Sequence, residues 1–224
     1  MIGFYNYTVI LTYLGLTSSA IGMFMLCSDK PFSFPLVICL LLFSGMCDMF
    51  DGRVARTRKR TSIEENFGAQ IDSLSDMICF GIFPATIGFH LTGRAPWAIP
   101  FLIIFILCGL IRLAYFDVRA IEKKYNPDAN ISSSYVGLPI TCSALLLPLL
   151  YSLKPLYYIF ISDTKTLGFE IFVAVSMLLC AAAFVSPFHI KKPGKLGVFC
   201  LLTFGVLIFV AAIIGNLAYN SSIG

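Results

Sequence analysis

Four aspartates stand close together in this sequence, at the ends of stretches that are otherwise apolar. Asp48 and Asp51 lie three residues apart, and Asp72 and Asp76 lie four residues apart. A carboxylate is costly in hydrocarbon, so such a group needs a compensating positive charge. Carboxylate oxygens suit the hard cations Mg²⁺ and Mn²⁺, and four of these groups can hold two ions. The four aspartates therefore predict a divalent-metal site.

The spacing of these aspartates predicts how helices bring them together. Residues three or four apart share one face of a helix. The first pair ends one apolar stretch, the second pair begins the next, and a short loop joins the two stretches. The two helices must then run antiparallel, with the pairs facing each other. We predict a pocket with oxygen ligands only, near one membrane surface.

Small residues and an arginine complete the motif. Residues 48–76 read D-x2-D-G-x2-A-R-x11-G-x3-D-x3-D. Gly52, Ala55 and Gly68 carry little or no side chain, so a ligand or a second helix can approach the backbone there. Arg56 can bind a phosphate through two hydrogen bonds. Metal, arginine and small residues together predict a pyrophosphate site at the bilayer surface.

The composition is that of an integral membrane protein. Of 224 residues, 58% are hydrophobic and 12% are charged, whereas soluble domains carry about 25% charged residues. A spanning helix needs roughly 20 apolar residues. We therefore predict an all-α polytopic membrane protein. Because the apolar stretch 155–162 is too short to span the membrane alone, any number of spans from six to eight is compatible with the sequence. Seven stretches qualify as spans: 6–26, 34–50, 71–90, 98–116, 135–153, 167–188 and 196–219.

The basic residues predict the orientation in the membrane. If the N-terminus is cytoplasmic, the outside segments hold only Lys30, Arg94, Lys154 and Lys165. This positive-inside bias predicts an N-terminus inside, a C-terminus outside and a pocket that faces the cytoplasm. The first span is interpreted as a mature helix rather than a signal peptide. The net charge of +4 indicates contact with anionic lipids and no nucleic acid. The inside segments hold Arg53, Arg56, Arg58, Lys59, Arg60, Arg112, Arg119, Lys123, Lys124, Lys191, Lys192 and Lys195.

The remaining residues that could do chemistry lack the pattern of a second site. The eight cysteines show no C-x2-C spacing and are interpreted as buried apolar residues, not as disulfides or zinc ligands. His90 and His189 fall on opposite membrane faces of the predicted topology, so they cannot form one catalytic pair. Residues 117–134 are predicted to be a polar linker.

The segment 48–76 resembles the signature of the CDP-alcohol phosphatidyltransferases, which are integral membrane enzymes of phospholipid synthesis. The interval from Arg56 to Gly68 is longer here than in the usual signature, and the extra residues fall in the loop, which tolerates insertion. The resemblance implies one catalytic domain, residues 1–224, in the cytoplasmic membrane. It has a six-helix core, here with about one extra transmembrane helix, and is usually a homodimer.

The same resemblance implies roles for the residues of the motif. Asp48, Asp51 and Asp72 would ligate Mg²⁺ or Mn²⁺, with two ions expected, and Asp76 would be a ligand, the catalytic base or both. The CDP moiety would lie against Gly52, Ala55, Arg56 and Gly68. Thr8 and Thr12, at the start of the first span, either contact the nucleotide or cap the helix at the interface.

Three further segments resemble bacterial-type phosphatidylserine synthases, namely R-L-A-Y-F-D at 112–117, Y-V-G-L-P-I at 135–140 and F-V-S-P at 184–187. The implied reaction transfers the phosphatidyl group of CDP-diacylglycerol to the hydroxyl of L-serine. Arg112 would pair with the serine carboxylate, or else snorkel to the interface or cap its helix. Asp117 either holds the serine ammonium or is solvated in a loop. Glycerol 3-phosphate and inositol phosphate stay open as acceptors, because the nearby basic residues can also bind phosphate.

Two other classes are less compatible with the pattern. A divalent cation transporter would hold carboxylates near the bilayer midplane, often in repeated halves, and no second set exists here. A prenyltransferase would also bind pyrophosphate through Mg²⁺, but the D-G-x2-A-R element argues against it. The predicted chemistry is therefore phosphoryl substitution. Asp76 would take the proton of the attacking hydroxyl, a transfer that contributes roughly 100- to 10,000-fold.

Overall fold

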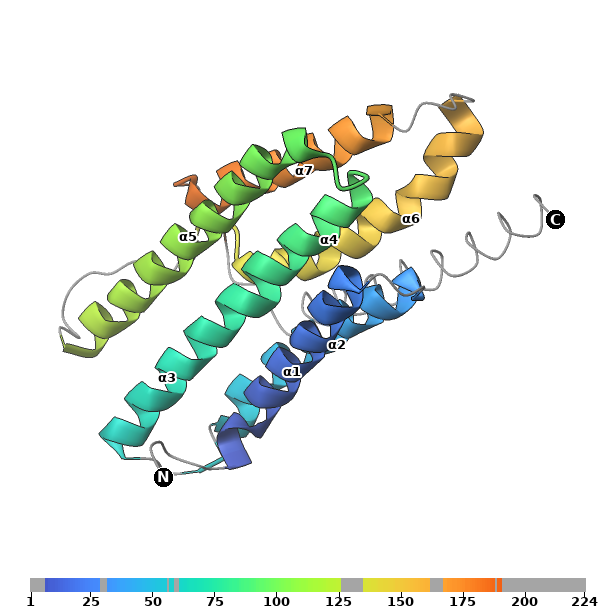
Figure 1. Ribbon diagram of the computed structural model, residues 1–224. Helices are drawn as coiled ribbons and strands as arrows, with labels where there is room; N and C mark the ends of the chain where they lie inside the picture. The colour runs from blue at the N-terminus through green and yellow to red at the C-terminus, as the bar shows by residue number, and fades with distance from the viewer. Residues whose placement is uncertain are drawn as a thin grey trace.

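The structure is a computed structural model that describes residues 7–28, 32–55, 57–58, 61–125, 135–161, 167–187 and 189–190. In this part the chain is almost entirely helical (Figure 1). The predicted span 196–219 lies outside the described residues. The α-helices are α1 (Ile10–Cys27), α2 (Phe34–Ala55), α3 (Ser62–Asp76), α4 (Phe83–Leu91), α5 (Ile99–Tyr125), α6 (Ser143–Ile161) and α7 (Leu167–Val185). The short elements are η1 (Tyr7–Val9), the π-helical η2 (Met77–Ile82), η3 (Pro96–Ala98), η4 (Ile140–Cys142), and the antiparallel pair β1 (Tyr135–Val136) and β2 (His189–Ile190).

The helices have the lengths and composition of membrane spans, so the all-α polytopic prediction is confirmed. Within the described residues, five helices are long and apolar enough to cross a membrane. One of them is continuous from Ser62 to Leu91 through α3, η2 and α4. The apolar helical stretch Ile140–Pro155, which comprises η4 and the first part of α6, is shorter. The five are Ile10–Cys27, Phe34–Ala55, Ser62–Leu91, Pro96–Glu122 and Leu167–Val185.

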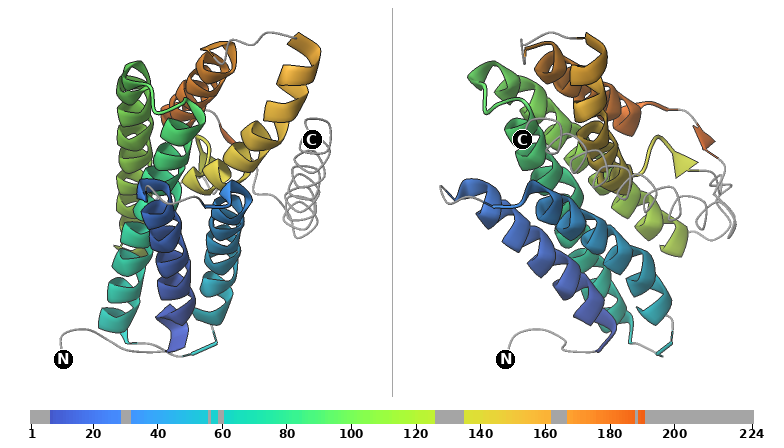
Figure 2. Two further views of the ribbon diagram at one scale, coloured as in Figure 1. Left: turned by 45° about the vertical axis from the view of Figure 1, so that its right-hand side comes forward. Right: turned by 90° about the vertical axis from the view of Figure 1, so that its right-hand side faces the viewer.

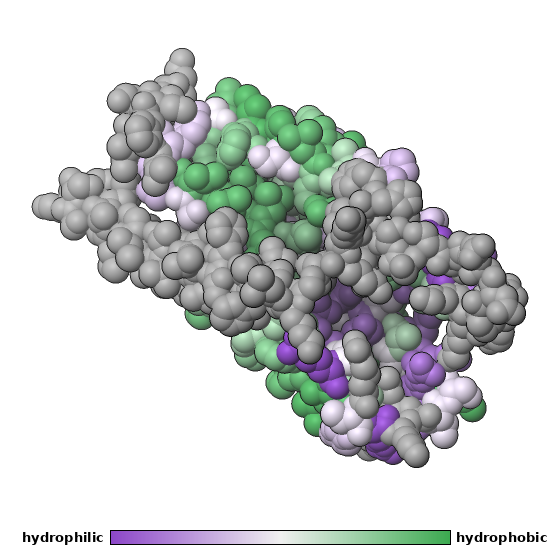
Figure 3. Space-filling view, turned by 180° about the vertical axis from the view of Figure 1, so that it is seen from behind, coloured by the Kyte–Doolittle hydropathy of each residue, from purple (hydrophilic) through white to green (hydrophobic). Residues whose placement is uncertain are grey.

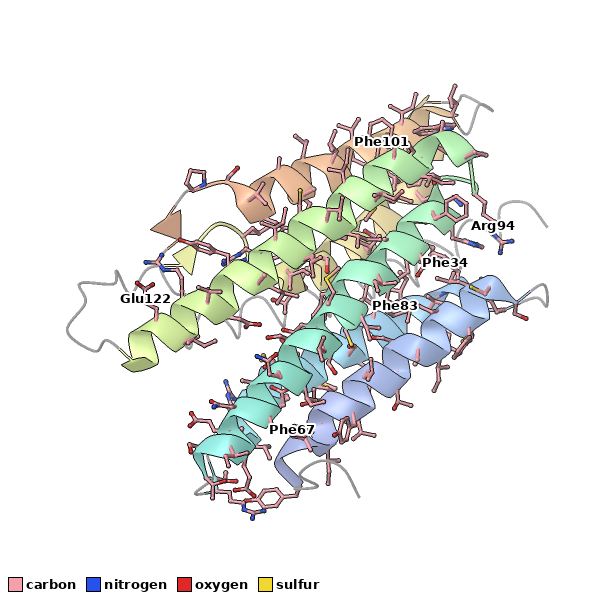
Figure 4. The ribbon with its side chains drawn as sticks, turned by 60° about the vertical axis from the view of Figure 1, so that its left-hand side comes forward. Phe34, Phe67, Phe83, Arg94, Phe101 and Glu122 are labelled. Atoms are coloured by element: carbon pink, nitrogen blue, oxygen red, sulfur yellow. The ribbon has the colours of Figure 1, made fainter. Side chains whose placement is uncertain are left out.

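The continuous α3–α4 helix is the centre of the bundle. It lies between α5 on one side and α1 with α2 on the other, while α7 packs along α5 (Figure 2). The ring of Phe83 packs directly on Gly22 of α1, where a Cβ atom would overlap it. Figure 4 shows Phe83 at this position, midway between Phe67 at one end and Phe34 with Arg94 at the other. This contact holds α1 close to the helix that carries Asp72 and Asp76.

The predicted fifth span, 135–153, begins in the wrong place. Residues 135–136 form β1 and pair with β2, and the helix starts only at Ser143, after a turn and η4. Gly137 has φ +75°, a conformation that favours glycine, and a Cβ atom there would lie 2.6 Å from the Phe184 carbonyl oxygen. Pro139 follows and has no N–H to donate. At its other end α6 continues to Ile161, through the stretch that was too short to span alone.

The predicted linker 117–134 is also partly wrong, because α5 continues to Tyr125. Residues 117–125 contain good helix formers and no glycine or proline. As a result, Asp117 belongs to a helix rather than to a loop.

The start of α3 is fixed by a capping box. The Oγ1 atom of Thr61 accepts from the Glu64 N–H at 3.3 Å, and the Thr61 N–H donates to Glu64 Oε2 at 2.9 Å. Arg58 also lies 3.7 Å from Glu64 Oε1. The cap satisfies donors that have no partner within the helix. It therefore defines where the loop from α2 ends and the helix that carries Asp72 and Asp76 begins.

Replacing the cap should loosen the first turn of α3. Loss of an N-cap side chain costs about 1 kcal/mol, so we expect Thr61→Ala to speed amide hydrogen exchange of residues 62–65 about fivefold. Thr61→Ser keeps the oxygen and should exchange like the wild type. Equal exchange in the alanine and serine variants would show that the cap does not stabilise this turn.

Candidate active site

The aspartates of α2 and α3 converge at one end of the bundle. Asp48, Asp72 and Asp76 each place one carboxylate oxygen so that the three atoms lie within 4.8 Å of one another. Asp48, Asp51 and Asp76 also line one small cavity. The two helices thus run antiparallel and face each other with both pairs, as their spacing predicts. We call this group of four the aspartate cluster.

The aspartate cluster fits a divalent cation by its chemistry. No lysine or arginine among the described residues forms an ion pair with any of its four members. Like charges at this distance repel strongly away from bulk water. Hard oxygen ligands are those that Mg²⁺ and Mn²⁺ prefer, and a cation removes the repulsion. Asp48, Asp72 and Asp76 are the three ligands that the geometry offers together.

Asp51 is held by a contact from α1. The Oγ1 atom of Thr12 donates to Asp51 Oδ2 at 3.1 Å, and Asp51 is buried. Sequence reasoning placed Thr12 near a nucleotide or at a cap and did not find this bond. The sequence shows that Thr12 is a hydroxyl residue near the start of an apolar span, but it does not show that Asp51 is its hydrogen-bond partner. Asp51 therefore lies beside the converging oxygens, oriented by a neighbouring helix.

The polar region extends from the aspartates into the bundle. A small cavity of about 10 Å³ lies below them, room for about one water molecule. Figure 3 shows hydrophilic side chains gathered in a hollow toward one end of the molecule, next to a largely apolar surface. The cavity is lined by Leu11, Thr12, Gly15, Ser44, Asp48, Asp51, Ser75, Asp76, Cys79 and Phe80.

Gly52 faces open space. A Cβ atom built there would meet no other atom within 4 Å, in contrast to the crowded Gly22. Packing therefore does not require glycine at this position, one residue from Asp51. Ala55 is the last residue of α2, and Gly68 lies in α3 one turn before Asp72. Arg56 and the side chain of Thr8 lie outside the described residues.

Arg112 is buried and ties three elements together. It is 5% exposed, and its Nε donates to the Leu138 carbonyl at 3.1 Å. Its guanidinium lies 4.7 Å from the centre of the Phe116 ring. The Leu138 N–H in turn donates to the Ala183 carbonyl at the end of α7. Arg112 is thus enclosed between α5 and the Gly137–Pro139 turn, instead of extending to the interface as the snorkelling alternative required.

Asp117 reaches the aspartate cluster through Ser73. The Ser73 hydroxyl donates to Asp117 Oδ1 at 2.8 Å, across 44 residues of sequence. Ser73 directly follows Asp72, and the Asp117 charge acts on Asp72. The loop alternative for Asp117 is therefore wrong. Ser73 had no assigned role in the sequence reasoning, since a serine in a helix gives no signal of a distant partner.

The two described histidine positions lie in different parts of the molecule. His90 stacks on Phe34 with ring centres 5.1 Å apart, near Arg94, whose Nη2 donates to the Leu26 carbonyl. Figure 4 shows Phe34 and Arg94 at the end away from Phe67 and Glu122. His189 pairs with Val136 in the short β-pair. The described cysteines are all free.

Several known proteins resemble this chain in sequence. The chain is 39% identical over 112 residues to the CDP-diacylglycerol–serine O-phosphatidyltransferase of Saccharomyces cerevisiae, covering 49% of this chain and 40% of that protein. It is 30% identical over 167 residues to the Helicobacter pylori (strain 26695) protein of the same name, covering 73% and 65%. It is 33% identical over 114 residues to the archaetidylserine synthase of Methanothermobacter thermautotrophicus, covering 50% and 44%.

These alignments span less than two thirds of the relatives' own length. No solved structure matches the chain. The family model of the CDP-alcohol phosphatidyltransferases matches residues 5–187, which include every described member of the site. The chain therefore belongs to the CDP-alcohol phosphatidyltransferase family.

Proposed function

We propose that this protein transfers the phosphatidyl group of CDP-diacylglycerol to the hydroxyl of L-serine, which yields phosphatidylserine and CMP. The observation that carries the proposal is the convergence of Asp48, Asp72 and Asp76 oxygens within 4.8 Å in a chain of this family. Relatives from yeast and Helicobacter pylori that are named CDP-diacylglycerol–serine O-phosphatidyltransferases support serine as the acceptor.

The aspartate cluster would hold the metal. Asp48, Asp72 and Asp76 would bind Mg²⁺ or Mn²⁺, and Asp51, oriented by Thr12, would complete a set of four for a second ion. When bound, such ions neutralise the charge of the pyrophosphate and stabilise CMP as it leaves. A domain of residues 1–224, a homodimer and a site that faces the cytoplasm are parts of the same proposal.

The other residues around the metal site would bind the donor and the acceptor. Gly52, with no neighbour within 4 Å of its Cβ position, would let the CDP moiety approach the backbone, together with Ala55, Arg56, Gly68 and Thr8. Arg112 would bind the serine carboxylate. The donor thus lies against α2 and α3, and the acceptor approaches from α5.

Asp76 would act as the base. It takes the proton of the serine hydroxyl while the oxygen attacks the phosphorus that bears the diacylglycerol, and the bond from this phosphorus to CMP breaks. Asp76 ends α3 where the π-helical η2 begins. Such irregular turns are frequent at functional sites, because they redirect side chains locally. Its oxygen lies within the converging three, where a bound cation would hold the phosphate nearby.

An acceptor panel tests the function directly. Purified protein in detergent, with CDP-diacylglycerol and Mn²⁺, is offered L-serine, glycerol 3-phosphate or inositol phosphate, and CMP release is measured. We expect release with serine and the formation of phosphatidylserine. Release with glycerol 3-phosphate alone would replace the serine assignment. Cation flux into liposomes without CMP release would identify a transporter.

Removing the metal or the base should abolish turnover. We expect EDTA to stop CMP release and added Mg²⁺ or Mn²⁺ to restore it. Asp76→Asn should lower kcat roughly 100- to 10,000-fold while CDP-diacylglycerol still binds, because Asp48 and Asp72 remain. Glu65→Gln, a change on the exposed side of the same helix, is the control and should keep its activity. An Asp76→Asn enzyme with normal kcat would refute the base.

Two glycine variants separate donor binding from packing. Gly52→Ala adds a methyl group in open space, so the melting temperature in detergent should stay equal or rise. Its KM for CDP-diacylglycerol should rise at least about tenfold, the loss of about 1.4 kcal/mol of binding. Gly22→Ala forces the methyl group into the Phe83 ring and should lower the melting temperature instead. A wild-type KM in Gly52→Ala would contradict the donor contact.

A further inference from the structure

Asp117 is a fifth carboxylate at the edge of the aspartate cluster, and it comes from a different helix. Its Oδ1 accepts from Ser73 at 2.8 Å, next to Asp72 on α3. It does not belong to the three carboxylates that converge for a metal. A further negative charge beside Asp72 increases the repulsion within the site. A cationic group of a ligand would be attracted to this place.

The nearby arginines of α5 do not supply that cation. Arg112 is directed to the Leu138 carbonyl and the Phe116 ring. Arg119 donates from Nη1 to the Tyr115 hydroxyl at 3.3 Å, with its guanidinium 5.6 Å from the centre of that ring. No lysine or arginine in the described ranges forms an ion pair with Asp117. Neither arginine therefore neutralises the charge of Asp117.

We propose that Asp117 binds the ammonium group of the acceptor and selects an amino alcohol over a phosphorylated alcohol. The inference rests on the proposed function, in which α5 provides the acceptor side. An ammonium group donates charge-assisted hydrogen bonds to a carboxylate. The phosphate of glycerol 3-phosphate or inositol phosphate would be repelled at the same place, which adds discrimination against it.

With Arg112, this role makes α5 complementary to a zwitterion. Arg112 carries the positive charge for the acceptor carboxylate, and Asp117 carries the negative charge for its ammonium, five residues further along the helix. Ser73 holds one oxygen of Asp117 and leaves the other to bind the acceptor. The hydrogen bond from Ser73 thus orients the Asp117 carboxylate, and the negative charge of this carboxylate binds the acceptor.

The test removes the ammonium from the acceptor and the charge from the residue, separately and together. CMP release is measured with L-serine and with 3-hydroxypropionate, which is serine without its amino group. We expect Asp117→Asn to lower kcat/KM for serine about 10- to 100-fold, mainly through KM. The value for 3-hydroxypropionate should stay within about threefold, since that acceptor has no group for Asp117 to bind. An unchanged KM for CDP-diacylglycerol shows that the variant is folded.

Glu122→Gln is the matched control, because it removes an exposed carboxylate from the same helix and has no part in the proposed site. It should change kcat/KM for serine by no more than about threefold. If Asp117→Asn weakens both acceptors equally, or if Glu122→Gln weakens serine as much as Asp117→Asn does, Asp117 does not bind the ammonium group and the inference is overturned. A wild-type protein that uses glycerol 3-phosphate and not serine overturns the proposed function, and this role with it.

Discussion

The repulsion between carboxylates at one end of an apolar bundle is the constraint on which the rest of the structure depends. Three carboxylate oxygens lie within 4.8 Å, and no described lysine or arginine pairs with them. A bound cation would relieve this repulsion, and the helices have to be held rigidly in place against it. The cap at Thr61 precedes Asp72 and Asp76 along their helix, and the packing of Phe83 on Gly22 follows them, so the helix is fixed on both sides of the cluster.

Side-chain hydrogen bonds bind the surrounding helices to this end of the bundle. Thr12 on α1 holds Asp51 on α2, Ser73 on α3 holds Asp117 on α5, and Arg112 on α5 holds the Leu138 carbonyl. Apolar surfaces associate only weakly inside a lipid bilayer, so hydrogen bonds and close packing specify which helices meet. The same contacts therefore assemble the bundle and orient the groups of the candidate site.

The sequence predicts the local part of this arrangement well and the distant part poorly. Spacings of three and four residues bring Asp48, Asp51, Asp72 and Asp76 onto facing helix surfaces, because two neighbouring helices and the short loop between them contain all the necessary geometry. The Ser73–Asp117 bond joins residues 44 apart, and only the packing of α5 decides it. Hydropathy likewise missed the turn at Gly137, since an apolar window does not report a positive φ.

The site divides into two halves that can change independently. The aspartate cluster and the open backbone at Gly52 belong to α2 and α3, whereas Arg112 and Asp117 belong to α5. A shared hydrogen bond, Ser73 to Asp117, joins the halves without involving a carboxylate of the converging three. If α2 and α3 hold the metal and the CDP donor, a substitution on α5 can alter the acceptor without displacing them. The charges on α5 would then decide the headgroup, while the same phosphoryl chemistry proceeds beside it.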